Sequence, residues 1–282
     1  MELSCKNHLA AMATRIRMAA IDGVFAAQSG HPGGSLSVAD MMAYLYFKEL
    51  RLDVSRPRWE GRDRLVLSKG HTAPALYGAL ALKGFFPMEE IKKLRQAGAM
   101  LQGHPDMKGT PGVDMSSGSL GQGVSAAVGM ALAGKLDAAD YRVYAILGDG
   151  EIEEGQVWEA AMFASHKKLD NLCVIVDNNN LQIDGTVEEV NSPYPIPEKF
   201  EAFGFHVICI DGHDFDQIEA ALDEAKTIKG QPTAIVMKTV KGKGVSFMEN
   251  QVSWHGSAPK QEQYDMAMDE LKEALAGYGE EG

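Results

Sequence analysis

Cysteine, aromatic residues and positive charge are scarce in this sequence, and each shortage excludes a class of protein. The three cysteines among 282 residues, Cys5, Cys173 and Cys209, are too few and too scattered for a disulfide framework or a zinc site. Two of them lie in apolar stretches, where cysteine behaves as a small hydrophobic residue. The formal net charge of −12 argues against nucleic acid or an anionic membrane as partner, because these ligands need a local excess of positive charge.

Long hydrophobic runs are also lacking. The first residues, Met1 to Lys6, contain no apolar signal-peptide core, and no apolar run approaches the roughly 20 residues that span a bilayer. We therefore expect a cytoplasmic protein. Glycine, in contrast, is abundant: 30 glycines, 45% hydrophobic residues and only 7% aromatic residues are typical of a soluble α/β protein with many tight turns.

Apolar stretches alternate with helical periodicity along the chain. We expect strands at 64–67, 141–147, 172–176, 205–210 and 233–239. We expect helices at 9–27, 38–50, 73–82, 88–97, 124–133, 156–168, 215–226 and 261–275. Glycine- or proline-rich connections separate them at 29–34, 103–123, 191–197 and 241–255. This alternation predicts an α/β fold, a doubly wound, mostly parallel sheet with helices on both faces.

The domain organisation is predicted from the absence of any break in composition. We expect a single domain over residues 1–282, which ends in a mobile loop and a helix over about 241–282.

The most informative motif follows the expected strand 141–147. Gly148-Asp149-Gly150-Glu151 stands there, and Asn178-Asn179-Asn180 follows the strand 172–176, which places Asn179 30 residues after Asp149. Two parallel strands joined by a helix bring both motifs to the carboxyl edge of the sheet, where ligands bind. Carboxylate and amide oxygens suit a small divalent cation, and the glycines let a diphosphate approach the backbone. Either motif alone would be an ordinary turn, but the pair predicts a cation and diphosphate site.

Four of the eight histidines stand beside glycine in expected loops: His31, His71, His104 and His255. Any one of them could be an ordinary surface residue. Imidazole near its neutral pKa can donate to sugar or phosphate oxygens and can shuttle protons, so the set predicts a polar cleft. The other four histidines lack this setting and are interpreted as structural: His8, His166, His206 and His213.

Five motifs, in order along the chain, resemble those of the transketolase family. They are SGHPGGS at 29–35, LSKGH at 67–71, QGHPD at 102–106, GSLGQG at 118–123, and GDG at 148–150 with EG at 154–155. With His255 the match spans nearly the whole chain. The motif at 118–123 could be mistaken for a dinucleotide fingerprint, but no strand precedes it.

The resemblance implies a thiamin diphosphate-binding fold of the PP type and a set of site residues. Asp149, Asn179 and the carbonyl of Leu181 would bind Mg2+ (or Ca2+ or Mn2+). His71 and His255 would lie near the diphosphate and the reacting carbon, and His31 and His104 would bind oxygens of the donor sugar. The cofactor-binding residues implied in the same way are His71, Gly118, Leu120, Gly148, Asp149, Gly150, Glu151, Asn179, Ile183 and His255.

Two further carboxylates belong to the implied catalytic set. Glu154 and Glu159 match residues that couple two cofactor sites across the dimer interface in transketolases. For Glu159 the alternative is an ordinary charge on a helix surface.

The resemblance covers only part of a transketolase, whose chain is normally more than twice as long. The sequence ends 27 residues after His255, so we expect the N-terminal subunit of a split transketolase. A separate partner with the pyrimidine-binding and C-terminal domains would supply the glutamate that activates the cofactor, in an α2β2 heterotetramer. The implied reaction transfers a two-carbon ketol group from a ketose phosphate to an aldose phosphate, as in the pentose phosphate pathway. Arginines that recognise phosphate are expected in the partner.

Other functions remain open at this point. A related thiamin-dependent ketol transferase could act on another sugar, for example a sulfonated one. Deoxyxylulose-phosphate synthase and the α subunit of 2-oxo acid dehydrogenases share the chemistry but match fewer of the motifs. A binding subunit that kept the fold without catalysis is a further alternative, although Asp149, Asn179 and the four loop histidines are all retained.

Overall fold

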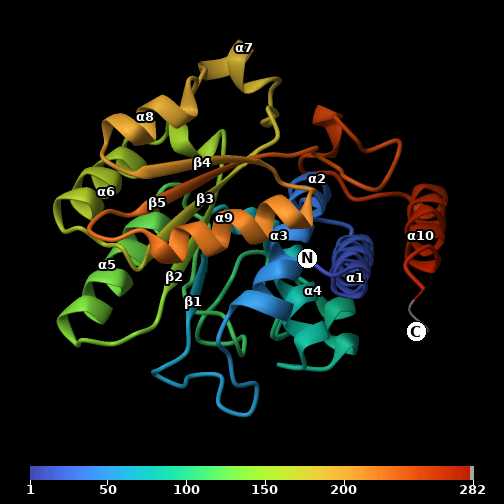
Figure 1. The fold of residues 1–282 in the computed structure, drawn as a ribbon. Helices are drawn as coiled ribbons and strands as arrows, with labels where there is room; N and C mark the ends of the chain where they lie inside the picture. Colours follow the sequence, from blue (N-terminus) through green and yellow to red (C-terminus); the bar gives the residue numbers. More distant parts are fainter. Residues whose placement is uncertain (280–282) are drawn as a thin grey trace.

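Five parallel strands form the sheet at the centre of this computed structural model, which describes residues 1–279 (Figure 1). The strands are β1 (Arg64–Leu67), β2 (Val143–Gly148), β3 (Leu172–Asn178), β4 (His206–Asp211) and β5 (Thr233–Lys238). Their order across the sheet is β1-β2-β3-β5-β4, and every neighbouring pair is parallel. The predicted doubly wound α/β fold is thereby confirmed.

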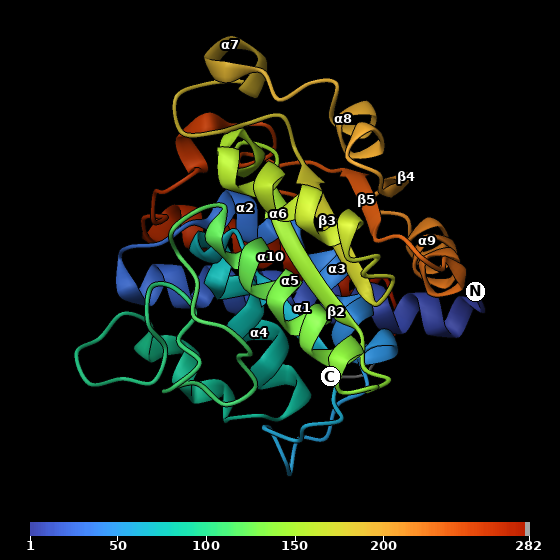
Figure 2. The same ribbon diagram turned by 90° about the vertical axis from the view of Figure 1, so that its left-hand side faces the viewer.

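Helices cover both faces of this sheet. They are α1 (Leu3–Ala27), α2 (Pro32–Ser37), α3 (Ala39–Tyr44), α4 (Ala73–Lys83), α5 (Gln122–Leu136), α6 (Gly155–His166), α7 (Val187–Asn191), α8 (Ile196–Ala202), α9 (Phe215–Thr227) and α10 (Gln261–Ala276). Helices α5, α6 and α8 lie on one face, and α1, α3, α4 and α9 lie on the other (Figures 1 and 2). No helix within residues 1–279 is long and apolar enough to cross a membrane.

The alternation of side chains along each strand divides the apolar residues into two cores. On β2, Tyr144 and Ile146 pack with α1, α3 and α4, whereas Val143, Ala145 and Leu147 pack with α5 and α6. Every residue of β2 is buried, as expected for a strand covered on both faces. This explains why the central strands could be recognised from continuous apolar stretches.

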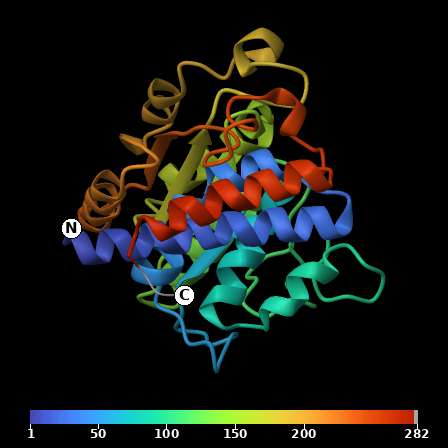
Figure 3. The same cartoon turned by 90° about the vertical axis from the view of Figure 1, so that its right-hand side faces the viewer.

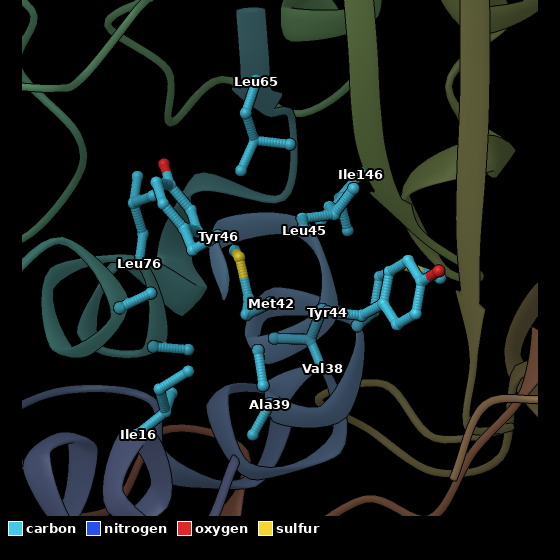
Figure 4. Close-up of a cluster of buried hydrophobic side chains, with 14 of the residues drawn as sticks. Ile16, Val38, Ala39, Met42, Tyr44, Leu45, Tyr46, Leu65, Leu76 and Ile146 are labelled. Carbon is cyan, nitrogen blue, oxygen red and sulfur yellow. The ribbon is translucent and has the colours of Figure 1, made fainter. Parts of the chain in front are cut away.

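Figure 4 shows part of the first core. Met42 of α3 lies among Ile16 of α1, Leu76 of α4, and the sheet residues Leu65 and Ile146. Side chains from three helices therefore meet the same face of β1 and β2.

A smaller apolar cluster holds the segment that follows β5. Val245, Met248 and Trp254 pack with Leu36 of α2 and Leu271 of α10. Figure 3 shows α10 lying alongside α1 on the outside of the molecule. The predicted helix 261–275 is thus present, and the predicted mobility of the loop before it stays a prediction.

The expected helix at 38–50 differs from the structure. Helix α2 begins at Pro32, inside the segment predicted as a loop ended by proline, and α3 passes into a π-helical turn, Leu45–Glu49. Proline fits the first turn of a helix because its missing N–H needs no partner there. All six residues of α2 are buried, so packing stabilises a segment whose two glycines disfavour a helix.

The expected helix at 88–97 is much shorter. A 3-10 helix, Met88–Lys93, ends before Arg95, whose φ of +62° is left-handed. The Arg95 N–H donates to the carbonyl of Leu101 at 2.9 Å. A residue in this conformation cannot continue a right-handed helix.

Smaller differences have similar local causes. Helix α1 starts at Leu3, six residues before the predicted start. The prediction missed its first turns because they are polar and show no apolar periodicity. The proline-rich connection at 191–197 contains the start of α8, where Pro197 stands in the first turn. Cys173 is buried in β3, but Cys209 is exposed on the edge strand β4 and does not pack as predicted.

The burial of β3 predicts that truncating one of its side chains destabilises the fold. Ile175 lies in the central strand and is fully buried, so Ile175→Ala should lower the free energy of unfolding by about 2–5 kcal/mol through the cavity it leaves. Urea unfolding followed by circular dichroism measures this. Leu136→Ala is the control, because Leu136 is 77% exposed and its truncation should change stability by less than about 0.5 kcal/mol. Equal losses in the two variants would contradict the placement of β3.

Candidate active site

A cavity of about 210 Å3 opens at the carboxyl edge of the sheet. Twelve of the fifteen site residues predicted from the sequence line it: His31, His71, Gly118, Leu120, Gly148, Asp149, Gly150, Glu151, Asn179, Leu181, Ile183 and His255. The remaining three do not line it: His104, Glu154 and Glu159. Folding therefore brings together residues from motifs more than 200 positions apart.

The pairing of β2 with β3 explains why Asp149 and Asn179 meet. Gly148 stands opposite Asp177 in the parallel register, and the Asp149 N–H donates to the Asp177 carbonyl at 3.2 Å. The Asp149 carboxylate accepts the N–H of Gly150 at 2.9 Å and also the N–H of Asn180. The carboxylate is thus fixed against the asparagine loop.

Three residues that line this end of the cavity carry oxygen atoms of the kinds that bind hard cations. These oxygen atoms belong to the carboxylate of Asp149, the side-chain carbonyl of Asn179 and the backbone carbonyl of Leu181. Asn179 Oδ1 accepts the Leu181 N–H at 3.2 Å, while its Nδ2 faces Asp177 at 3.5 Å, which orients the amide. Residues 1–279 contain no group of three or more His, Cys, Asp or Glu that could hold a metal. A hard-oxygen set of this kind fits a cation that also binds phosphate oxygens.

Burial shifts the acidity of Asp149. Removal from water, together with the negative charge of Asp177, raises the pKa of Asp149 to about 7. The N–H groups of Asn180 and Gly150, followed by the charge of Lys241, oppose this rise. The site therefore favours a positive charge beside Asp149.

Lys241 supplies such a charge, and sequence reasoning missed it. The side chain is only 2% exposed, and Nζ lies 2.9 Å from the Leu181 carbonyl and 2.8 Å from Nδ1 of His255. Burial lowers the pKa of Lys241 to about 8, although Asp149 acts in the opposite direction. The only sequence signal was a glycine directly after the lysine, as at Lys69.

A buried ion pair lies beneath the cavity. Asp177 is fully buried and accepts hydrogen bonds from Lys69 Nζ, from Ser37 Oγ at 2.6 Å and from Thr239 Oγ1. Burial alone would raise the pKa of Asp177, but Lys69 and the hydroxyl groups hold it below its usual value. Lys69 Nζ also donates to the carbonyl of Gly34 at 3.2 Å. The network joins α2 to the ends of β1, β3 and β5.

Glu151 holds three loops together. Its carboxylate accepts the N–H of Gly148 at 3.0 Å, the N–H of Gly121 at 2.9 Å and the hydroxyl of Ser68. The residue is 2% exposed, and burial raises its pKa. Both carboxylate oxygens are thereby occupied, so Glu151 positions the loops that carry other site residues.

The four histidines predicted from the loops gather at the cavity. The ring centre of His31 lies 5.2 Å from that of His71, 5.6 Å from that of His255 and 6.5 Å from that of His104. His71 and His255 stack at 5.3 Å. The nearness of His104 to His31 is consistent with a shared ligand even though His104 lies outside the cavity lining.

The pKa values of these histidines are lower than the near-neutral value expected from the sequence. Burial, aided by the charge of Arg95, lowers the pKa of His31 to about 4 and also lowers that of His104. Burial and Lys241 lower the pKa of His255 to about 3, and burial lowers that of His71. The rings are therefore neutral at pH 7. They can donate or accept hydrogen bonds, but they are weak bases.

Gly118 makes a close approach possible. Its φ is +150°, and a Cβ there would lie 3.0 Å from Cδ2 of His104. Tyr77 holds the other side of this loop, because its hydroxyl donates to the carbonyls of Gln102 at 2.9 Å and His104 at 3.0 Å. A side chain at position 118 would displace the imidazole.

The remaining predicted residues lie at the rim or outside the cavity. Leu120 and Ile183 line it but are 36% and 66% exposed, so each leaves much of its apolar surface open to solvent. Glu154 and Glu159 are exposed on the segment that begins α6. Their role between two cofactor sites stays a prediction.

His213, which was interpreted as structural from the sequence, fixes the backbone next to Lys241. Its Nδ1 lies 2.7 Å from the Asp40 carboxylate, which also pairs with Arg17. Its Nε2 accepts the N–H of Val240 at 2.9 Å. The residue before Lys241 is thus tied to α3.

The oxygen donors, the buried lysine and the strand-end glycines define a diphosphate-binding domain of the α/β class. Residues 8–276 match the family described as "Transketolase, thiamine diphosphate binding domain", and the chain belongs to that family. The resemblance to transketolase is confirmed, and the family's description names the expected cofactor.

Two of the relatives are separate transketolase subunits that align with this chain over most of their own length. The chain is 51% identical to the 6-deoxy-6-sulfo-D-fructose transketolase subunit SqwG of Clostridium sp. (strain MSTE9), over 86% of this chain and 88% of that protein. It is 41% identical to one subunit of the apulose-4-phosphate transketolase of Phocaeicola vulgatus, over 90% of each. A transketolase structure from Pichia stipitis, in complex with sedoheptulose 7-phosphate, aligns with a TM-score of 0.89 and 33% identity. The alignment covers 96% of this chain but 43% of that one.

The shifted acidity of Asp149 leads to a second expectation. Since its pKa rises from the usual 3.8 to about 7, the folded chain keeps a proton that the unfolded chain loses between these values. The free energy of unfolding therefore falls as pH rises through this window. Asp149→Asn removes the titration, and the variant should gain stability relative to the wild type from about pH 4 to about pH 7. Urea unfolding of both ligand-free chains tests this, and a difference independent of pH would refute it.

Proposed function

We propose that this chain is the N-terminal subunit of a thiamin diphosphate-dependent transketolase that needs a separate partner subunit. The observation that carries the proposal is the convergence of Asp149, Asn179, the Leu181 carbonyl and the buried Lys241 in one cavity lined by neutral histidines. The match to separate transketolase subunits along nearly their whole length supports it.

In this proposal the chain holds the diphosphate end of the cofactor. Asp149, Asn179 and the Leu181 carbonyl would hold Mg2+, or Ca2+ or Mn2+, and the remaining coordination positions would go to diphosphate oxygens. Lys241 and His71 would donate to the same diphosphate, with Gly150 leaving room for it. The bound cofactor supplies the nucleophilic carbon that carries the ketol group.

The neutral histidines would bind the donor sugar. His31 has a buried Nδ1 without a hydrogen-bond partner in the described part of the chain, so a ligand hydroxyl or carbonyl can satisfy it. His104 and His255 flank it. Neutral imidazoles can pair with sugar hydroxyl groups in either direction, which suits a substrate rich in them.

Arg95 adds a positive charge at the outer end of this group. After burial, its charge is the next cause that lowers the pKa of His31 and His104, and it opposes the burial that raises the pKa of Tyr77. Its side chain is exposed beside Gly103. We place the terminal anionic group of the substrate here, so this chain contributes an arginine alongside those expected in the partner. Guanidinium suits both phosphate and sulfonate oxygens.

Two classes of donor are candidates. The family reaction favours a ketose phosphate with an aldose phosphate acceptor, as in the pentose phosphate pathway. The 51% identity to a subunit named for 6-deoxy-6-sulfofructose favours a sulfonated ketose as the second candidate. Both carry a terminal anion, which the proposed contact with Arg95 would bind.

The partner would carry the pyrimidine-binding and C-terminal domains, in a cytoplasmic α2β2 heterotetramer. Glu154 and Glu159, exposed near the start of α6, would then lie between the two cofactor sites. We propose these residues as coupling groups because they are exposed carboxylates outside the cavity. Glu154 is also close to Gly121, where an added Cβ would lie 2.9 Å from Cβ of Glu154.

The decisive experiment is co-expression with a candidate partner chain that carries the pyrimidine-binding domain. Ketol transfer should require both chains, thiamin diphosphate and a divalent cation, and the chain alone should be inactive. Asp149→Ala should abolish cation-dependent cofactor binding, measured by calorimetry. Enzyme-like rates from the isolated chain would refute the two-subunit assignment, and unchanged cofactor affinity in Asp149→Ala would refute the ligand assignment.

Arg95→Gln tests the position of the substrate's anion. For donors with a terminal phosphate or sulfonate, kcat/KM should fall at least about tenfold, since hydrogen bonds to charged groups contribute about 1.5–3 kcal/mol. For a ketol donor without a terminal anion it should not change. Lys92→Gln, an exposed cation on the same segment, is the control. An equal loss with both kinds of donor would remove Arg95 from the proposed contact.

A further inference from the structure

The ammonium group of Lys241 already contacts one of the three oxygen atoms assigned to the proposed cation. Its Nζ donates to the Leu181 carbonyl at 2.9 Å, and this carbonyl is one of the three oxygen atoms assigned to the cation. The charges of Lys241 and Asp149 also act on each other, and both residues line the same cavity. The lysine thus contacts one assigned ligand and balances the charge of another.

The backbone of Lys241 is held firmly, so its side chain has a defined reach. The Asn250 N–H donates to the Lys241 carbonyl at 2.9 Å, and the next residue, Gly242, donates its N–H to the Gly33 carbonyl at 2.9 Å. The aliphatic stem passes over Gly33, where an added Cβ would lie 3.0 Å from Cγ of the lysine. The end of the side chain lines the cavity, where Nζ contacts the Leu181 carbonyl and Nδ1 of His255.

An ammonium ion and a divalent cation would compete for the Leu181 carbonyl. A carbonyl oxygen has two lone pairs, so it could in principle accept both, but the two positive charges would then lie within a few ångströms of each other in a buried place. Asp149 is the one carboxylate among the assigned ligands, and Asp177 is already paired with Lys69, so the negative charge there is too small to balance three positive charges. A diphosphate would supply the missing negative charge.

We propose that Lys241 acts as a stand-in cation, which holds the divalent cation's position until a diphosphate arrives and makes the binding of cation and diphosphate mutually dependent. This inference rests on the proposed function. When diphosphate enters, the ammonium group turns from the Leu181 carbonyl to a phosphate oxygen, and the carbonyl becomes available to the cation. Because linkage is reciprocal, the cation strengthens diphosphate binding by the same factor.

A simpler role for Lys241 makes a different prediction. If the lysine only contacts diphosphate, its removal weakens cofactor binding and leaves the affinity for the cation alone unchanged. If it is a stand-in cation, its removal strengthens binding of the cation alone. The two roles therefore differ in the sign of one measurable effect.

The experiment uses the full chain and Mn2+, with free Mn2+ measured by electron paramagnetic resonance. Lys241→Met should bind Mn2+ alone about tenfold more tightly than the wild type, a factor within the usual range of coupling between sites. Thiamin diphosphate should tighten Mn2+ binding strongly in the wild type and less in the variant. Lys241→Arg keeps the charge and should stay weak for Mn2+ alone.

Controls separate this inference from the assignment of the ligands. Lys243→Met makes the same change two residues away, at a side chain outside the cavity, and should bind Mn2+ like the wild type. Asp149→Ala should abolish Mn2+ binding in the Lys241→Met background; if binding persists there, the proposed cation site is wrong. If Asp149→Ala abolishes it but Lys241→Met binds no more tightly than the wild type, or neither binds detectably, the stand-in role is refuted. Circular dichroism and thermal unfolding confirm that each variant is folded.

Discussion

The buried carboxylate of Asp177 is the constraint on which the rest of the site depends. A fully buried charge is tolerated only when it is paired and hydrogen-bonded, and Asp177 satisfies this through Lys69, Ser37 and Thr239. These partners come from α2 and from the ends of two other strands. Satisfying one carboxylate therefore fixes the relative positions of the segments that carry the cavity, and Asn179 is oriented by the same group.

Charge balance explains the arrangement above Asp177. Three carboxylates, Asp149, Glu151 and Asp177, and two ammonium groups, Lys69 and Lys241, lie in one buried region. The histidines add no charge at neutral pH, because burial and the nearby cations lower their pKa values. The opposite charges largely offset each other, and the lysine and histidine donors can be turned toward an anionic ligand.

The sequence predicted what depends on local pattern and missed what depends on tertiary contact. The buried strands and the meeting of Asp149 with Asn179 followed from apolar stretches and parallel topology. Helix α2 was missed because its glycines disfavour a helix that packing stabilises, and the early end at Arg95 was missed because a left-handed residue leaves no periodic signal. Lys241 could not be predicted, because the glycine that follows it also follows other lysines, and its partners lie 60 and 14 residues away in the sequence.

The left-handed turn at Arg95 has a consequence for how such a subunit can diversify. The Arg95 N–H donates to the Leu101 carbonyl, and this segment is separate in the sequence from the strand ends that carry Asp149 and Asn179. On the proposed assignment, the groups that choose among sugars and the groups that retain the vitamin-derived cofactor are encoded in separate stretches of chain. Substrate preference can drift during evolution while the cofactor apparatus is inherited unchanged.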